Sequence, residues 1–334
     1  MRGHEIAQTE PQGFHKAIDG DGDPYQYIIR PGGRHLVVHT KGSREYPAFF
    51  YLHGSPGWGG GPMPRPAKLE TDRMYMIAPT RPAYYCSDEQ PDRTFADTAD
   101  DIAAIAKELG IDKYYVIGRS IGGLHALATL SRNGDAVLGA ALLGSMAPPE
   151  TLDPAMWTDG MIRGNAKLLE MSDQKVIDDF RELGRLAAFE NDDFRKVPPD
   201  LSERARDEIR RQSIAPLLQT AYRKAYGKDG MGWPYDILAL KRGMGDLLKN
   251  IDGQKVLLYY NTEDQYTPLQ HGHTLHRLLP GSQLYVNYGL VNNDYRESLK
   301  REDPQSLFLE NYDTHFGGFN NLFFAAAKLK TNNR

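Results

Sequence analysis

Residues 113–129 read KYYVIGRSIGGLHALAT, and this stretch decides the fold class of the chain. Residues 114–117 are β-branched or aromatic, so they suit a short buried strand. Residues 123–129 are small and apolar at the spacing of a helix. The turn between them has the pattern G-x-S-x-G around Ser120, with glycines expected where a side chain would clash with the adjoining strand or helix. The stretch therefore predicts a strand, a tight turn and a helix, with a serine at the turn.

A serine in this position has the setting of a nucleophile. The hydroxyl of Ser120 would stand above the sheet at the N-terminus of a helix, where the backbone N–H of Ile121 would face a developing oxyanion. Arg119 precedes the serine and is a candidate to contact a substrate. Because glycine and serine are common, the alternative is a Gly-rich turn with an ordinary serine. The flanking strand and helix favour the nucleophile.

The composition is that of an ordinary globular protein. The chain has 334 residues, of which 40% are hydrophobic and 25% charged, enough for one large α/β domain with an insertion. Its net charge of −4 argues against a nucleic-acid binder, which would carry a basic patch. No window approaches the ~20 apolar residues of a membrane span, and we expect no secretory signal because the N-terminal residues are polar. The one cysteine, Cys86, excludes an internal disulfide and is typical of a reducing cytosol, so we expect a cytoplasmic protein.

Short apolar runs predict the other strands of a mainly parallel sheet. The run at residues 48–52 is continuously apolar, as a buried parallel strand requires, and leads directly into HGSPG at residues 53–57. Residues 92–109 form an amphipathic helix that Gly110 would end. Residues 1 to about 23 are expected to be a loose lead-in. The remaining strands are expected at residues 25–30, 35–40, 74–79, 136–143, 255–260 and 284–288.

Three segments together resemble the α/β-hydrolase superfamily: HGSPG at residues 53–57, TRPAYYCSD at residues 80–88, and the helix, strand and serine turn at residues 97–123. Within it the sequence is most similar to proline-iminopeptidase-like and esterase-like proteins, densely over residues 47–147 and more loosely over residues 233–289. The resemblance implies an α/β-hydrolase fold, with a mostly parallel eight-stranded sheet, flanking helices and a helical cap inserted over the active site.

The resemblance also implies an oxyanion hole. The HG-x-PG loop of the family supplies one N–H, here that of Ser55, beside the N–H of Ile121, and glycines let the backbone approach the substrate oxygen. A flexible Gly/Pro loop is the alternative. His53, which begins the loop, and Tyr84 and Tyr85, near the pocket mouth, are further candidates to contact the substrate.

The cap of the family corresponds to residues 150–232, where the composition becomes charged and helical after the double proline at residues 148–149. The hydrolase core would then comprise residues 1–149 and 233–334. Cap helices are expected at residues 176–189 and 201–214. Trp157 in the same segment is a candidate for the pocket wall, because ligand pockets are mostly apolar or aromatic.

The triad acid of the family follows the strand expected at residues 255–260, in a pattern like G-x-x-D-x-x-x-P. Asp264 and Pro268 match this pattern, with Asn261 in place of the glycine. Glu263 is the alternative acid, although the register favours Asp264. The resemblance therefore assigns Asp264 the role of orienting the catalytic histidine.

The sequence departs from the family at two places. The pattern D-R-P-G-x-G-x-S is altered, with Thr80 in place of the acid and Ala83 and Tyr85 in place of two glycines, so we expect a remodelled loop. The turn after the last strand, where the family carries its catalytic histidine, contains none. The next histidine is His315 in DTHFGG, which requires an insertion at residues 290–312. The resemblance makes His315 the general base.

Three histidines follow the expected acid on a helix: His271, His273 and His276. No Asp or Glu completes an obvious metal site with them, and their spacing matches no known motif. We therefore expect no metal here, and a solvated helix face instead.

These observations predict a serine hydrolase that cleaves an ester, lactone, thioester or small amide through Ser120, Asp264 and His315. This is the chain order of the triad in this fold. No cofactor or metal is expected. The expected partner is a small-molecule substrate, with no nucleic acid and no membrane, and a homo-oligomer is left open. The alternative is a protein of the same fold that binds a small ligand, or that catalyses cyclisation or carbon–carbon chemistry, because fold does not fix function.

Overall fold

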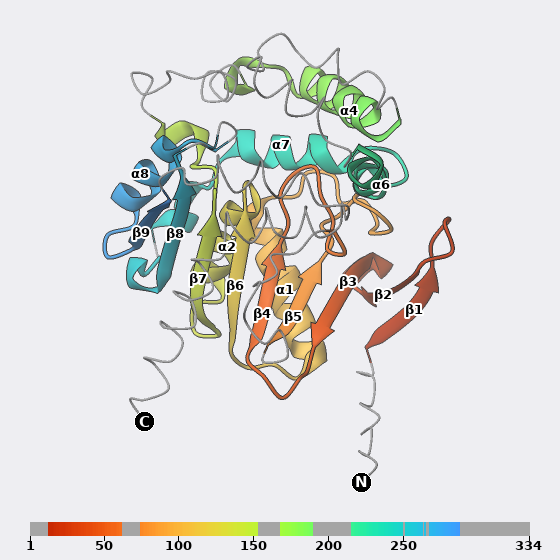
Figure 1. Cartoon of the computed structure of the whole chain (residues 1–334), viewed down its shortest axis with the longest axis horizontal. Coiled ribbons are helices and arrows are strands. Elements are labelled where there is room, and N and C mark those ends of the chain that lie inside the picture. The colour runs from red at the N-terminus through yellow and green to blue at the C-terminus, as the bar shows by residue number, and fades with distance from the viewer. Residues whose placement is uncertain are drawn as a thin grey trace, which may run out of the picture.

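The computed structural model describes residues 13–61, 74–152, 168–189, 215–249, 251–262, 264 and 267–287. Within these residues nine strands form one sheet, in the order β1-β2-β3-β5-β4-β6-β7-β8-β9 (Figure 1). The pairs from β5 to β9 are parallel, whereas β1, β2 and β3 pair antiparallel with each other and β3 with β5. The strands are β1 (Phe14–Ile18), β2 (Pro24–Ile29), β3 (His35–Gly42), β4 (Ala48–Leu52), β5 (Tyr75–Pro79), β6 (Tyr114–Arg119), β7 (Val137–Leu143), β8 (Val256–Asn261) and β9 (Gln283–Asn287).

The central strands lie where the apolar runs predicted them. Every residue of β4 and of β8 is buried, because a parallel strand in mid-sheet is covered on both faces. The parallel pairing also brings the carboxyl ends of β4, β6, β7 and β8 to one edge of the sheet. This edge is where the loops with the candidate site residues begin.

The described residues form nine strands of the sheet rather than the expected eight, because residues 14–18 form β1 instead of a loose lead-in. β1 pairs with β2 from Phe14 opposite Ile28 to Ile18 opposite Pro24. The turn between them is closed by Asp19, whose carboxylate accepts the N–H groups of Asp21 and Asp23, each at 2.9 Å. β1 is mostly exposed at the edge of the sheet, so backbone pairing and not an apolar pattern defines it.

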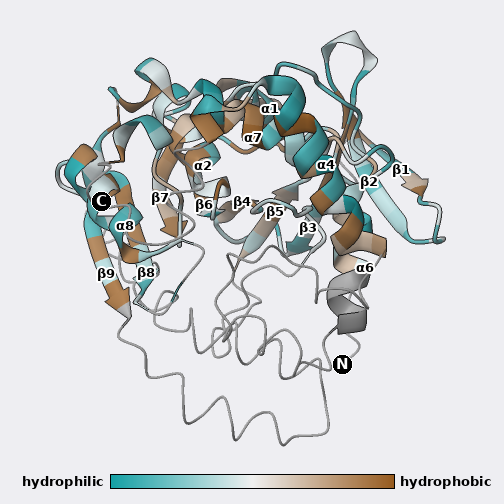
Figure 2. Cartoon of the chain, turned by 90° about the horizontal axis from the view of Figure 1, so that it is seen from above, coloured by the Kyte–Doolittle hydropathy of each residue, from teal (hydrophilic) through white to brown (hydrophobic). Residues whose placement is uncertain are grey.

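Two helices, α1 (Phe95–Leu109) and α2 (Gly122–Arg132), lie on the same side of the sheet and pack against each other (Figure 2). The amphipathic pattern of α1 is confirmed, because its buried residues include Phe95, Ile102 and Ile105. Gly110 ends the helix at φ 66°, in the left-handed region that glycine enters freely.

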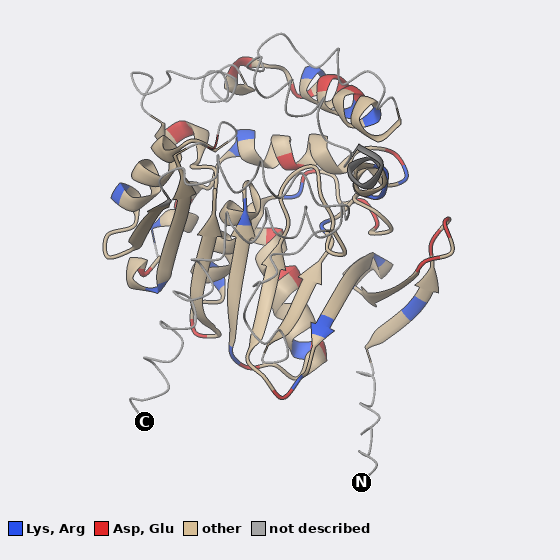
Figure 3. Ribbon diagram, viewed as in Figure 1, with Lys and Arg blue, Asp and Glu red and all other residues tan. Residues whose placement is uncertain are grey.

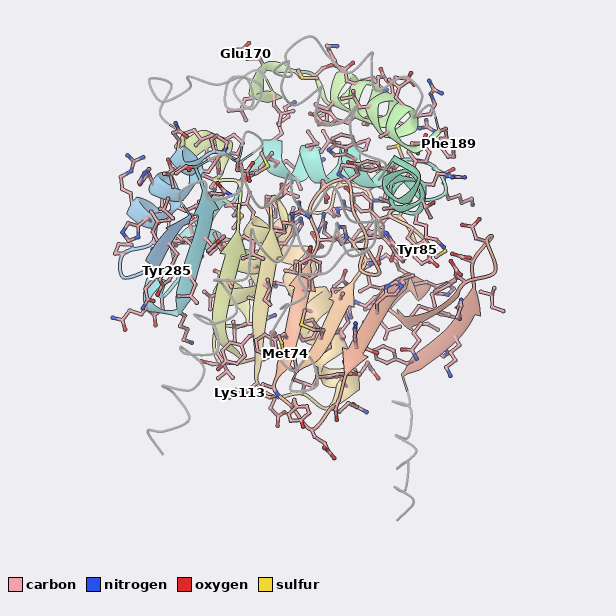
Figure 4. The ribbon with its side chains drawn as sticks, in the orientation of Figure 1. Met74, Tyr85, Lys113, Glu170, Phe189 and Tyr285 are labelled. Atoms are coloured by element: carbon pink, nitrogen blue, oxygen red, sulfur yellow. The ribbon has the colours of Figure 1, made fainter. Side chains whose placement is uncertain are left out.

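Three further helices lie beyond the carboxyl ends of the strands: α4 (Asp173–Phe189), α6 (Ala215–Tyr226) and α7 (Gly232–Arg242). Figure 4 shows Glu170 and Phe189 at this end of the molecule and Lys113 and Met74 at the opposite end of the sheet. α4 packs against both α6 and α7. The helix expected at residues 201–214 lies outside the described residues.

The last described helix, α8 (Leu269–Leu278), packs against β8 and β9. Short 3₁₀ turns cover Pro31–Gly33, Pro149–Thr151, Gly245–Leu248 and Gly253–Lys255. No helix among the described ranges combines the length and the hydropathy needed to span a membrane.

Candidate active site

Ser120 lies in the turn between β6 and α2, at the carboxyl edge of the sheet. Its backbone has φ 54°, in the left-handed region that residues other than glycine rarely adopt. The Ser120 N–H donates to the carbonyl of Leu143 at 3.1 Å, and the Ser120 carbonyl accepts the N–H of Gly123 at 3.0 Å. The strained turn is thus held by the neighbouring strand on one side and by its own helix on the other.

The glycines around Ser120 are required by close packing, as the sequence predicted. A Cβ on Gly118 would lie 2.2 Å from the carbonyl oxygen of Gly122, and a Cβ on Gly122 would lie 2.2 Å from the carbonyl oxygen of Leu52. A Cβ on Gly123 would lie 2.0 Å from Oγ of Ser145. Only glycine lets β6, α2 and the end of β4 meet at this point.

The candidate oxyanion loop, residues 53–57 and called the oxyanion loop below, crosses directly beside Ser120. A Cβ on Gly54 would lie 3.3 Å from Cβ and 3.9 Å from Oγ of Ser120. Within the described chain, the backbone N–H groups of Ser55 and Ile121 donate no hydrogen bond. Two N–H donors that have no acceptor among the described residues therefore lie in the segments that adjoin the serine.

Asp264 follows β8 and lies at the same edge. Its carboxylate accepts the N–H and the hydroxyl of Thr267, each at 2.9 Å. A Cβ on Gly144, the residue after β7, would lie 3.2 Å from Oδ2 of Asp264. Since the Ser120 N–H binds Leu143 at the end of that strand, one strand end separates the candidate nucleophile from the candidate acid. His315, Glu263 and Trp157 lie outside the described residues.

A buried ionic cluster, formed by Arg81, Arg93 and Asp236, lies beneath the oxyanion loop. Asp236 comes from α7 and is completely buried. Its Oδ2 accepts Nη2 of Arg81 at 2.6 Å, and its Oδ1 accepts Nη2 of Arg93 at 2.5 Å. Burial alone raises the pKa of Asp236, but the guanidinium groups of Arg81 and Arg93 outweigh it and hold the pKa well below its ordinary value. Asp236 is therefore an ionised carboxylate.

No motif in the sequence points to this cluster. Charged residues usually lie at the surface, and Figure 3 shows them gathered on α4 and on the loops, with few along the central strands. Arg81 falls in the altered loop at residues 80–88, and Asp236 falls just inside the core segment expected from residue 233. Asp236 lies 155 residues after Arg81 and 143 residues after Arg93, so only the folded structure brings the three side chains together.

His53 belongs to the protein interior and not to a substrate-binding surface. It is 3% exposed, and its Nε2 accepts the N–H of Arg81 at 3.2 Å. Nδ1 must then carry the proton, which it donates to the carbonyl of Gly54 at 2.7 Å. Burial and the charge of Arg81 lower the pKa of His53 well below its ordinary value. Both ring nitrogens are occupied, so the predicted substrate contact of His53 is replaced by support of the oxyanion loop.

His125 on α2 is also buried and lies next to the ionic cluster. Its Nδ1 lies 2.8 Å from Oγ1 of Thr98, and its Nε2 lies 3.7 Å from Oδ1 of Asp236. Burial and the charge of Arg81 lower the pKa of His125 to about 4. The ring is therefore neutral at pH 7.

The two tyrosines expected at the pocket mouth have different surroundings. Tyr84 is buried, and its hydroxyl donates to Asp236 at 2.8 Å. Tyr85 lies beside the N-terminal hairpin (Figure 4), where its hydroxyl donates to Asp19 at 2.6 Å.

The Arg119 side chain is exposed, as a residue that meets substrate would be. Tyr84 contacts a small cavity lined mostly by apolar and aromatic residues: Pro56, Tyr84, Gly184, Tyr222, Ala225, Tyr226, Gly230 and Trp233.

The loop at residues 80–87 keeps an unusual backbone at the positions where the family pattern has glycine. Ala83 has φ 65° and Tyr85 has φ 49°, both in the left-handed region. The conformation that glycine would adopt freely is thus present without glycine, at a cost in strain.

The solvated helix face expected for the three histidines on α8 holds for His273 and His276, which are exposed, but not for His271. His271 is completely buried, and its Nδ1 accepts the N–H of Ala147 at 3.0 Å. Burial lowers the pKa of His271 to about 4. His271 lies on the side of α8 that packs against the sheet, whereas His273 is exposed. The described ranges contain no group of three or more potential ligands that could hold a metal ion.

Comparisons with known proteins agree with the fold described above. A family model described as alpha/beta hydrolase fold matches residues 47–289. An esterase from Exiguobacterium antarcticum is 21% identical with a TM-score of 0.55, over 84% of this chain and 97% of its own. A carboxylesterase structure from Nitrososphaera gargenis is 13% identical with a TM-score of 0.60, and the match covers 90% of this chain and 99% of that one. The enol-lactonase from Burkholderia xenovorans LB400 is 14% identical with a TM-score of 0.55, and the match covers 86% of this chain and 99% of that one. A search of curated proteins found no significant match.

Proposed function

The chain belongs to the alpha/beta hydrolase fold family, and on that premise we propose that it is a serine hydrolase with Ser120 as its nucleophile. The observation that carries the proposal is the strained backbone of Ser120, at φ 54°, directly beside the oxyanion loop. Strain of this kind persists where the surrounding structure enforces it, and it is common at reactive residues. An ordinary serine in a Gly-rich turn would gain nothing from this conformation.

In the proposed reaction, Oγ of Ser120 attacks the carbonyl carbon of the substrate while His315 accepts the hydroxyl proton. The carbonyl oxygen becomes an oxyanion that receives hydrogen bonds from the N–H groups of Ser55 and Ile121. The carbonyl then re-forms, the bond to the leaving group breaks, and the histidine returns its proton to that group. A water molecule releases the acyl group by the same steps, while Asp264 orients the histidine.

Esters and lactones are the first substrates to test. Two of the compared structures carry the names of an esterase and of an enol-lactonase, and the fold is shared over nearly their whole length. Thioesters and small amides use the same acyl transfer and stay in the proposal. We assign residues 150–232 to a cap and the rest to the hydrolase core, since α4 and α6 lie over the edge that carries Ser120.

The experiment combines a fluorophosphonate label with a panel of p-nitrophenyl esters, lactones and aminoacyl amides. The wild type should be labelled and Ser120→Ala should not. Ser120→Ala should also lower kcat/KM for the best substrate by ~10³-fold or more, because the covalent route is lost while binding survives. A wild-type serine that stays unlabelled, with no hydrolysis across the panel, would instead favour ligand binding or non-hydrolytic chemistry.

A further inference from the structure

We propose that Arg81 and Asp236 form a positioning pair that fixes the direction of the Ser55 N–H in the oxyanion hole. Through this pair, the direction of the N–H depends on the position of α7. The inference rests on the proposed function, since it assigns a task within that reaction. Neither residue reaches the reacting atoms, so both act through the oxyanion loop.

Arg81 holds two successive carbonyls of that loop. Its Nη1 donates to the carbonyl of His53 at 2.5 Å, and its Nη2 donates to the carbonyl of Gly54 at 3.1 Å. The Gly54 carbonyl and the Ser55 N–H belong to one planar trans peptide, so they point in opposite directions. By turning the carbonyl toward itself, Arg81 turns the N–H of Ser55 away from the cluster. That N–H is then left for the substrate oxygen.

Asp236 holds Arg81 in this position. It accepts Nε of Arg81 at 3.1 Å as well as Nη2 at 2.6 Å, a two-point contact that fixes the plane of the guanidinium. The same carboxylate accepts a hydrogen bond from the hydroxyl of Ser55. Asp236 thus contacts the side chain of the donor residue and also the guanidinium that orients its backbone.

The charges of the cluster add an electrostatic contribution. Arg81 and Arg93 are positive, Asp236 is negative, and the neighbouring rings of His53 and His125 are neutral because their pKa values are lowered. The cluster therefore carries one excess positive charge beneath the oxyanion loop. Because all its members are buried, water screens this charge weakly, and it favours the negative charge that develops in the transition state.

The pair also links two distant parts of the fold. Asp236 lies on α7, which packs against α4 and α6, the described helices of the proposed cap. Arg93 strengthens the link by donating from Nη2 to the carbonyl of Gly232 at 3.0 Å, at the start of α7. A displacement of α7 would withdraw the Asp236 carboxylate from Arg81. The oxyanion hole is therefore complete only when α7 packs in the position seen here.

The test compares Asp236→Asn with the wild type and with Asp101→Asn. Asp101 is a matched control because its buried carboxylate also binds two guanidinium groups, Arg30 at 2.7 Å and Arg34 at 2.6 Å, outside the site. We expect Asp236→Asn to lower kcat for a p-nitrophenyl ester by ~10²–10³-fold, the effect of losing one oxyanion donor, with KM changed by less than ~3-fold. Asp101→Asn should lose stability and keep the wild-type kcat.

Arg81→Lys is the second variant, because lysine keeps the charge but lacks the fork that binds both carbonyls. Its affinity for a trifluoromethyl ketone, which serine hydrolases bind as a tetrahedral oxyanion, should fall by the same factor as kcat/KM. A residue that only aids folding would lower the amount of active enzyme and leave both quantities per active site unchanged. If Asp236→Asn does not fold, the kcat/KM and the ketone affinity of Arg81→Lys test the proposal instead.

The outcomes separate the two proposals. Wild-type kcat and ketone affinity in folded Asp236→Asn or Arg81→Lys would overturn the positioning pair and leave the serine hydrolase intact. A wild type without Ser120-dependent hydrolysis or labelling would overturn the proposed function. In that case a crystal structure of Arg81→Lys decides on the pair: the Gly54 carbonyl should turn from its wild-type direction, and an unchanged carbonyl would refute the positioning.

Discussion

Replacing Gly122 by alanine tests whether the serine turn is packed as tightly as the structure shows. The new Cβ would lie 2.2 Å from the carbonyl oxygen of Leu52 and 2.6 Å from that of His53, whereas ordinary contacts begin at 3.4 Å. Both neighbours are backbone atoms, so no side chain can rotate out of the way. Either α2 or the end of β4 must move by about 1 Å or more.

Two effects follow from this displacement. Overpacking of this kind costs ~1–3 kcal/mol, and the gain in helix propensity from Gly to Ala returns only ~0.5–1 kcal/mol, so the free energy of unfolding should fall. The oxyanion loop begins at the displaced atoms, and a shift of ~1 Å at a catalytic group costs ~10²-fold in rate. Gly122→Ala should therefore lose stability and, in the fraction that stays folded, most of its kcat.

Urea unfolding and ester hydrolysis measure the two effects. Gly20→Ala is the control, because no atom lies within 4 Å of the new Cβ and the backbone there has no positive φ. It should change the free energy of unfolding by less than ~0.5 kcal/mol and leave kcat unaltered. Wild-type stability and kcat in Gly122→Ala would refute the close approach of α2 to β4, and with it the packing argument for the turn.

Three further predictions address the base, the altered loop and the buried histidines. His315→Ala should lower kcat about as much as Ser120→Ala, and the double variant should lose little more than either, because triad members act as a unit; hydrolysis assays that show full activity in His315→Ala would exclude this base. Ala83→Gly should raise the free energy of unfolding by up to ~1 kcal/mol in thermal denaturation, since glycine removes the strain at φ 65°, and a clear loss of stability would contradict the strain. Burial lowers the pKa of His271 to about 4, so between about pH 6.5 and that value the unfolded chain binds a proton that the folded chain does not. The free energy of unfolding should therefore have its full value above about pH 6.5 and fall toward pH 4. In His271→Asn the dependence of this free energy on pH should correspond to ~1 fewer proton taken up on unfolding, and an unchanged dependence would argue against a buried neutral ring.

Local chemistry was enough to predict the elements around the serine turn. The strand before Ser120, the glycines beside it and the amphipathic α1 depend on sterics and periodicity within a few residues. The structure confirms these elements, and also the buried strands whose apolar runs were continuous. The candidate role of Ser120 came from its setting between a strand and a helix. The roles of Asp264 and His315 came from the resemblance to the family, and all three stay predictions.

The missed features depend on partners outside the segments themselves. β1 has no apolar alternation, and only its pairing with β2 makes it a strand. His271 was expected on a solvated face, but the side of α8 that meets the sheet is decided by packing.

The ionic cluster shows the same limit most clearly. Asp236 lies 155 residues after Arg81 and 181 residues after Ser55 in the chain. A carboxylate by itself is stable only near water, so its sequence context predicts exposure. It can be buried here because two guanidinium groups from another part of the chain neutralise it and satisfy its oxygens. The sequence determined where the serine turn forms, whereas the tertiary structure alone decided which charges lie beneath the loop beside it.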